Sequence, residues 1–171
     1  MDLLHFDPQP LYFDEPLPDA VRELIEEAGL AYGEPRARTL LQQAAALAPD
    51  HLVVLVALYR YHFYQHDLDT ATAVAQRVIA HVGARLGLPE DGRDVGAAGV
   101  VAAAAQSMTL TRFYLSALKA LAYLRLRRGD TAEAVRLLET LLAVDAADRL
   151  GGRVLLDIAH ARQAELAASA P

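Results

Sequence analysis

The sequence contains no cysteine and no asparagine, and its 171 residues include a single lysine, Lys119. Without cysteine the chain can form no disulfide, no thiolate metal site and no cysteine nucleophile. The formal net charge is -6, and an acidic chain of this kind disfavours sequence-independent binding to nucleic acid. We therefore expect neither thiol chemistry nor a nucleic-acid partner, and the absence of cysteine fits a reducing compartment.

Long apolar runs are also missing. The longest weakly polar stretch, from Val95 to Met108, is shorter than the roughly 20 residues that cross a bilayer. The first 18 residues contain aspartates and four prolines, where a secretory signal would need a basic segment and an unbroken apolar run. These features predict a cytoplasmic protein with no membrane partner.

Apolar residues recur at helical spacing through most of the chain, and glycine, proline and aspartate separate the segments. This pattern predicts an all-α protein, and the length suits one compact domain. We expect an extended amino-terminal arm at residues 1–18 and a single helical domain at residues 19–171. Within that domain the sequence predicts helical hairpins at about 19–48, 51–86 and 110–146, an insertion at 87–109 and a capping helix at 148–168.

Polar residues near the expected helix starts predict how the helices are capped. Asp50 is expected to cap the helix from His51 to His66, and Thr109 or Thr111 the helix that ends near Arg128.

Two further local predictions concern the insertion and the last helix. Residues 87–99, which are rich in glycine and charge, are expected to form an exposed loop. The last helix is expected to begin near Asp148 and to carry its apolar residues, Leu150, Val154, Leu155, Ile158 and Leu166, on one side.

One segment carries a repeat pattern. Residues 118–146, LKALAYLRLRRGDTAEAVRLLETLLAVDA, combine large apolar residues with a Gly-Asp turn at Asp130 and with Ala134 four positions later. Residues 55–79 match in phase, with Asp67 at the turn and Ala71 at the small position. The two aspartates are 63 positions apart, which is one repeat of about 34 residues plus an insertion of roughly 29. In these features the chain resembles a tetratricopeptide-repeat protein.

The resemblance implies a right-handed α-α superhelix of three hairpins that acts as a non-enzymatic protein-interaction module. Such an adaptor or assembly chaperone would hold an extended segment of a partner in its concave groove. No cofactor is implied. Arginine and tyrosine are favoured interface anchors, and a mixed aromatic and basic groove predicts an acidic peptide partner. Carried over by position, the family pattern places nine residues in the groove: Val53, Val56, Arg60, Phe63, Tyr64, Ser116, Lys119, Tyr123 and Arg127.

A different function is suggested by His62 and His66, which stand four positions apart. On a helix this spacing puts two imidazoles on one face, where they can hold a metal. The alternative prediction is therefore a metal-binding or small-ligand-binding accessory enzyme. In the repeat register, however, His62 occupies the place of a packed aromatic residue, which favours a structural role.

Two predictions about self-contact stay open. The arm carries Phe6, Tyr12 and Phe13 beside acidic residues, so it competes with an external peptide for the groove. The Val95 to Met108 segment has small side chains and few charges. It either mediates a homodimer or covers the third hairpin.

Overall fold

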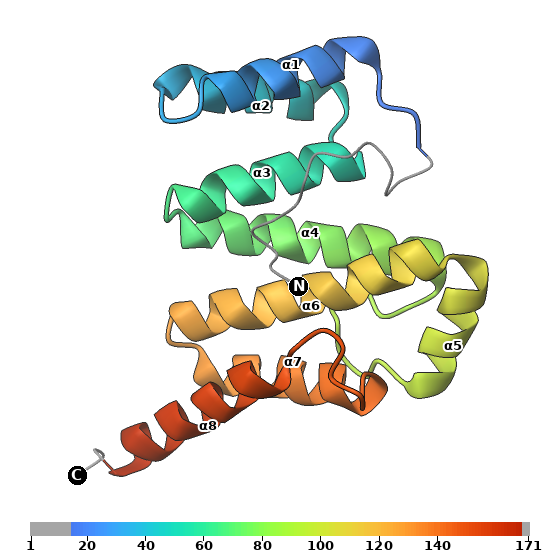
Figure 1. The fold of residues 1–171 in the computed structure, drawn as a ribbon, viewed down its shortest axis with the longest axis vertical. Coiled ribbons are helices and arrows are strands. Elements are labelled where there is room, and N and C mark those ends of the chain that lie inside the picture. The colour runs from blue at the N-terminus through green and yellow to red at the C-terminus, as the bar shows by residue number, and fades with distance from the viewer. Residues whose placement is uncertain (1–14, 169–171) are drawn as a thin grey trace. The chain divides into compact units, whose positions relative to one another are not determined.

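The computed structural model describes residues 15–168, and these residues are all-α (Figure 1). No strand occurs among them, which confirms the predicted all-α class, whereas the right-handed superhelix stays a prediction. The first 14 residues of the predicted arm, with its three aromatic residues, lie outside the described part of the chain. Within that part, no helix has the length and apolar character needed to span a membrane.

The chain divides into two compact units, and the boundary falls inside α4 (Leu68–Leu86), between Arg77 and Val78. The first unit contains the hairpin α1–α2, then α3 and the first half of α4. The second contains the rest of α4, the short α5, the hairpin α6–α7 and the last helix α8. The bounds of these helices are α1 Asp19–Leu30, α2 Pro35–Leu47, α3 Leu52–Tyr64, α5 Ala97–Gln106, α6 Met108–Arg127, α7 Thr131–Val144 and α8 Arg153–Ala168.

In the first unit, α2 begins at Pro35, where the fixed φ of proline suits a first helical turn. The cap of α3 differs from the prediction. The Nδ1 atom of His51 accepts a hydrogen bond from the Val53 amide at 3.2 Å, whereas the Asp50 carboxylate accepts one from Arg77. The backbone of His51 is extended, as a capping position requires. The prediction of Asp50 as the cap is therefore wrong.

In the second unit, α6 is the central helix, with Tyr114, Leu118 and Leu124 fully buried. Its start also differs from the prediction. Ser107 caps α6, because its hydroxyl oxygen accepts from the Leu110 amide at 3.2 Å. Thr109 and Thr111 lie inside the helix, so the prediction that one of them is the cap is wrong.

The segment between α4 and α5 is exposed only in part, whereas its composition predicts an exposed loop. Leu88, Gly92 and Val95 are buried, and the Pro89 carbonyl accepts a hydrogen bond of 2.5 Å from the Tyr114 hydroxyl. The segment is thus a strap packed onto the second unit, and only part of it faces solvent.

Two glycines make this close packing possible. A Cβ atom at Gly83 in α4 would lie 2.9 Å from the Pro89 carbonyl oxygen. At Gly92 the backbone has φ +71, and a Cβ atom there would clash with the Cδ2 atom of Leu118. A side chain at Gly83 or Gly92 would therefore force the strap away from the helices beneath it.

The last helix begins five residues later than predicted, at Arg153. Before it, the Asp148 carboxylate accepts hydrogen bonds from the amides of Gly152, at 2.6 Å, and Arg153, at 3.1 Å. Helix α8 packs through Ala159 and Leu156 against a small core made by α6 and α7. The predicted packed face is wrong in part, because Val154, Ile158 and Leu166 are exposed and Leu150 precedes the helix.

Candidate interaction site

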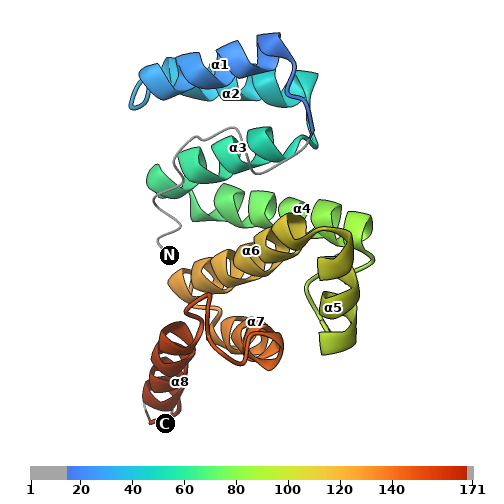
Figure 2. The ribbon, with the colours of Figure 1, turned by 45° about the vertical axis from the view of Figure 1, so that its right-hand side comes forward.

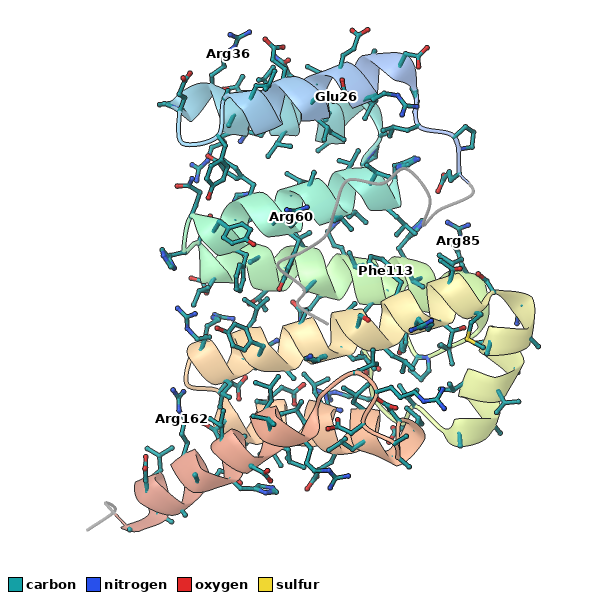
Figure 3. All side chains as sticks on the ribbon, viewed as in Figure 1. Glu26, Arg36, Arg60, Arg85, Phe113 and Arg162 are labelled. Atoms are coloured by element: carbon teal, nitrogen blue, oxygen red, sulfur yellow. The ribbon has the colours of Figure 1, made fainter. Side chains whose placement is uncertain are left out.

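Five of the predicted groove residues lie along one side of α3: four of them are three or four positions apart, and the fifth directly follows the fourth. We call them the α3 stripe. Four are half-buried and Tyr64 is exposed, whereas the core side of the helix, formed by residues such as Leu52 and Leu55, is fully buried. The structure therefore brings these five side chains together on one surface of the first unit. The members of the α3 stripe are Val53, Val56, Arg60, Phe63 and Tyr64. Figure 3 labels Arg60.

Aromatic rings order the carboxyl-terminal end of the α3 stripe. The rings of Tyr59 and Phe63 stack with centroids 5.8 Å apart, and Phe63 meets Tyr64 edge-on at 5.5 Å. Tyr32, from the turn after α1, lies edge-on to Tyr64 at 6.5 Å. Rings in mutual contact lose little further freedom when a ligand binds, so this end of α3 suits a binding surface.

The other four predicted residues follow a line along α6. We call them the α6 stripe: Ser116, Lys119, Tyr123 and Arg127. Sequence reasoning missed Arg112, which is exposed and four positions before Ser116. The same helical spacing would have identified it. The charges on α6 have one sign, because the helix carries four basic residues and no aspartate or glutamate.

Three members of the α6 stripe have partners within the second unit. The Lys119 ammonium donates a hydrogen bond of 2.5 Å to the Leu150 carbonyl, which ties α6 to the segment before α8. The Arg127 guanidinium donates to the Tyr123 hydroxyl at 3.1 Å and lies 5.8 Å from the centre of that ring. Arg127 and Tyr123 therefore form an ordered cation–aromatic pair, whereas Lys119 has a structural bond.

The α3 stripe belongs to the first unit and the α6 stripe to the second. Each is a surface of its own unit. The single groove predicted from both stripes stays a prediction.

The turns that follow the two stripe-bearing helices share one backbone pattern. After α3, the Asp67 amide donates to the His62 carbonyl at 2.9 Å, and His66 has φ 58. After α6, the Asp130 amide donates to the Arg125 carbonyl at 2.9 Å, and Gly129 has φ 83. Both are helix ends closed by a residue in the left-handed region.

The side chains of the two turns match as well. The Asp67 carboxylate accepts from the Thr70 amide at 3.2 Å, and its second oxygen lies 2.9 Å from the Nδ1 atom of His62. In the other turn, the Asp130 carboxylate accepts a hydrogen bond from the Glu133 amide at 3.4 Å and one from the Arg125 guanidinium at 3.3 Å. His62 therefore occupies in the first turn the place that Arg125 holds in the second turn.

These contacts change the electrostatics of Asp67. Burial raises the pKa of its carboxyl group, but hydrogen bonds from Thr70 and His62 outweigh that effect and hold the pKa below its usual value. The ionised carboxylate is thus the form that this turn requires.

The two histidines do not lie on one helical face. Helix α3 ends at Tyr64, and His66 lies beyond it with a left-handed backbone. The predicted arrangement of His62 and His66 on one helix is therefore wrong. Within residues 15–168, no group of three or more histidine, aspartate and glutamate side chains is placed to hold a metal ion.

A relative of this chain is found in Azotobacter chroococcum mcd 1, where it is described as an uncharacterized 19.8 kDa protein in the nifW 5′ region. The two sequences are 43% identical over 166 residues, which cover 97% of this chain and 93% of the relative. This chain belongs to the family of that protein. No family model and no solved structure matches the chain. The likeness to this family extends over nearly the whole chain, so it is not confined to one of the two units.

Proposed function

We propose that this protein is a tetratricopeptide-like, non-enzymatic interaction module of the cytoplasm, an adaptor or assembly chaperone that holds an extended segment of a protein partner. The observation that carries the proposal is the shared geometry of the two turns at Asp67 and Asp130. Each turn follows a helix with a partly exposed aromatic and basic stripe. A repeated hairpin that presents a repeated surface is the usual construction of a helical-repeat binding protein.

Small side chains at the helix contacts support the superhelical fold in this proposal. Ala122 and Ala134 are fully buried in the hairpin α6–α7, and Ala71 is fully buried at the matching place in α4. Small residues at such positions let two helices approach closely. The first hairpin is more divergent, since Glu34 at the start of α2 makes no side-chain capping bond.

The charges of the stripes favour an acidic segment as the ligand. Helix α6 carries basic residues and no acidic ones. Helix α3 contains no aspartate, glutamate or lysine, and its one arginine is Arg60. The chain as a whole has a net charge of -6. This separation of charge would guide an acidic segment to the stripes. Ordered tyrosine and arginine side chains would then supply contact area and hydrogen bonds.

The genetic context of the relative suggests a first partner to examine. The relative is described by its position in the 5′ region of nifW. We therefore propose the product of nifW as the first protein to test for binding to this chain.

The test is affinity capture from a lysate of the cells that make the protein, with purified nifW product as a separate binding assay. The variants are Arg60→Glu on the α3 stripe and Arg112→Glu with Arg127→Glu on the α6 stripe. The matched control is Arg149→Glu, which reverses an exposed charge outside both stripes. We expect the stripe variants to lose partners that the wild type and the control retain. Identical partners for all four proteins would contradict the proposal.

A further inference from the structure

The chain before α1 leads toward the α3 stripe. The Pro18 carbonyl accepts hydrogen bonds from the amides of Val21, at 2.9 Å, and Arg22, at 3.0 Å, which fix the direction in which the chain enters α1. Leu17 is half-buried. Figures 1 and 2 show that residues 15–18 run from the start of α1 toward the start of α3. All of these elements belong to the first unit. The 14 residues that precede this point are therefore attached at the end of α3 where the α3 stripe begins.

The length of that segment suits the α3 stripe. From Val53 to Tyr64 the stripe covers about 16 Å of helix axis. An extended chain covers about 3.3 Å per residue, so about five residues are enough. The five nearest to the described chain are residues 10–14. If they follow the stripe, they run in the direction opposite to α3.

The chemistry of the segment complements the α3 stripe. Residues 1–14 contain three aspartates, three aromatic residues and no lysine or arginine. The stripe carries Arg60 and the rings of Phe63 and Tyr64, and α3 has no acidic residue. Opposite charges attract across a contact, and aromatic rings pack on one another. The arm therefore has the acidic and aromatic character that the stripe favours in a ligand.

Prolines lower the cost of placing this segment on a helix. Pro8 and Pro10 precede Leu11, Tyr12 and Phe13 in the sequence, and two further prolines follow before α1. Each proline fixes φ and leaves no amide that needs an acceptor. A segment with few backbone conformations loses less entropy when it binds.

We propose that residues 10–14 of the arm bind the α3 stripe of their own chain and close it to an external acidic segment. The inference deepens the proposed function and rests on it for the role of the stripe. The arm acts as an internal ligand, and a partner reaches the stripe when the arm leaves it.

Attachment to the same chain makes even a weak contact effective. A short tether gives an effective concentration of about 1 mM. An arm with an intrinsic dissociation constant of about 0.1 mM would then leave the stripe open about one tenth of the time. The apparent affinity of a competing segment would fall about tenfold.

The first experiment measures binding of a fluorescein-labelled peptide with the sequence of residues 1–15 to full-length chains, by fluorescence anisotropy. In the arm variant, Tyr12→Ser and Phe13→Ser remove the two aromatic side chains nearest to α1. The matched control, Leu3→Ser with Leu4→Ser, removes two apolar side chains from the far end of the arm. We expect the arm variant to bind the peptide about tenfold more tightly than the wild type and the control do. Equal affinity of the wild type and the arm variant would overturn the proposal.

A charge reversal shows whether the peptide binds at the α3 stripe. Arg60→Glu, added to the arm variant, should weaken peptide binding at least tenfold. Arg149→Glu, which reverses an exposed charge outside both stripes, should leave it unchanged. Equal losses in the two charge variants would place the peptide elsewhere and overturn the proposal.

Engineered cysteines locate the arm in the full chain, since the sequence contains none of its own. Four extended residues before Glu15 cover about 13 Å, which brings Leu11 level with Arg60. Leu11→Cys should therefore form a disulfide within one chain with Phe63→Cys on mild oxidation. The control pairs Leu11→Cys with Glu26→Cys, which is exposed on α1 and within reach of the same tether. Equal yields in the two pairs, or a disulfide-linked dimer in place of the internal bond, would refute the internal contact.

These results separate the inference from the proposed function, because both experiments use only this chain and its own arm. If the arm neither cross-links to α3 nor binds as a peptide, the inference is wrong, and partner capture that depends on the stripes still supports the proposed function. If the arm binds the stripe while Arg60→Glu captures the same partners as the wild type, the internal contact is supported and the proposed function is contradicted.

Discussion

Substitution of Gly92 by alanine tests whether the strap between α4 and α5 is locked against the second unit. Gly92 is buried and has φ +71, and a Cβ atom at this position would clash with Leu118. Leu118 is itself fully buried, so it has little room to move. We expect Gly92→Ala to lower the free energy of unfolding through both the left-handed backbone and the clash.

The structure supplies a control that separates the two effects. Gly87 also has a left-handed backbone, with φ +67, but a Cβ atom there would have no neighbour within 4 Å. Alanine in this conformation costs about 1–2 kcal/mol, and overpacking a core adds about 1–3 kcal/mol. We therefore expect Gly87→Ala to lose about 1–2 kcal/mol and Gly92→Ala about 2–5 kcal/mol. The entropy that alanine removes from the unfolded chain is common to both variants.

The measurement is urea unfolding followed by circular dichroism, with both variants and the wild type under the same conditions. The quantity that decides is the difference in unfolding free energy between Gly92→Ala and Gly87→Ala. If Gly92→Ala is no less stable than Gly87→Ala, the strap is not held against Leu118 and the account of this segment is wrong.

Three other substitutions test the hydrogen bonds and backbone of the turns and the strap. Tyr114→Phe should lower the unfolding free energy by about 1–3 kcal/mol, because the Pro89 carbonyl loses its donor. Burial, with a smaller effect of Asp91, raises the pKa of Tyr114, so wild-type stability should fall above about pH 10 more steeply than that of the variant. The pKa of the Asp67 carboxyl group is lower in the folded chain than in the unfolded chain. Its contribution to the unfolding free energy is therefore present at neutral pH and lost in acid. Asp67→Asn should therefore flatten the loss of stability below about pH 4 in acid titrations. His66→Gly should raise the unfolding free energy by about 1 kcal/mol, because glycine tolerates the left-handed backbone of this position. The increase would be measured as a higher thermal midpoint.

The sequence predicted the positions of most helices because strong local signals mark their ends. Pro35 fixes the start of α2, and the Gly-Asp turn at Gly129 fixes the start of α7. Caps were harder to predict, because several neighbouring polar residues can cap a helix and the backbone dihedral angles decide among them. Thus His51 caps α3 although it follows an aspartate, and Ser107 caps α6 ahead of two threonines.

Features that depend on distant contacts were not predictable. The strap was expected to be exposed because glycine usually marks a solvent loop, whereas Gly92 is needed where the backbone meets a buried leucine. The residues of the α3 and α6 stripes were predicted from the resemblance to the tetratricopeptide pattern, carried over by position, and not from contacts between distant segments. The bond from Lys119 was missed because its acceptor is a backbone carbonyl 31 residues away, and no residue type marks such an acceptor.

The bond between Lys119 and the Leu150 carbonyl makes the single lysine side chain of this protein a chemical reporter. While its nitrogen is bonded to this carbonyl, Lys119 is held away from an acylating reagent, so it reacts when the bond opens. The rate of Lys119 modification, followed by mass spectrometry, therefore measures how often the segment before α8 opens. The reporter needs no engineered label.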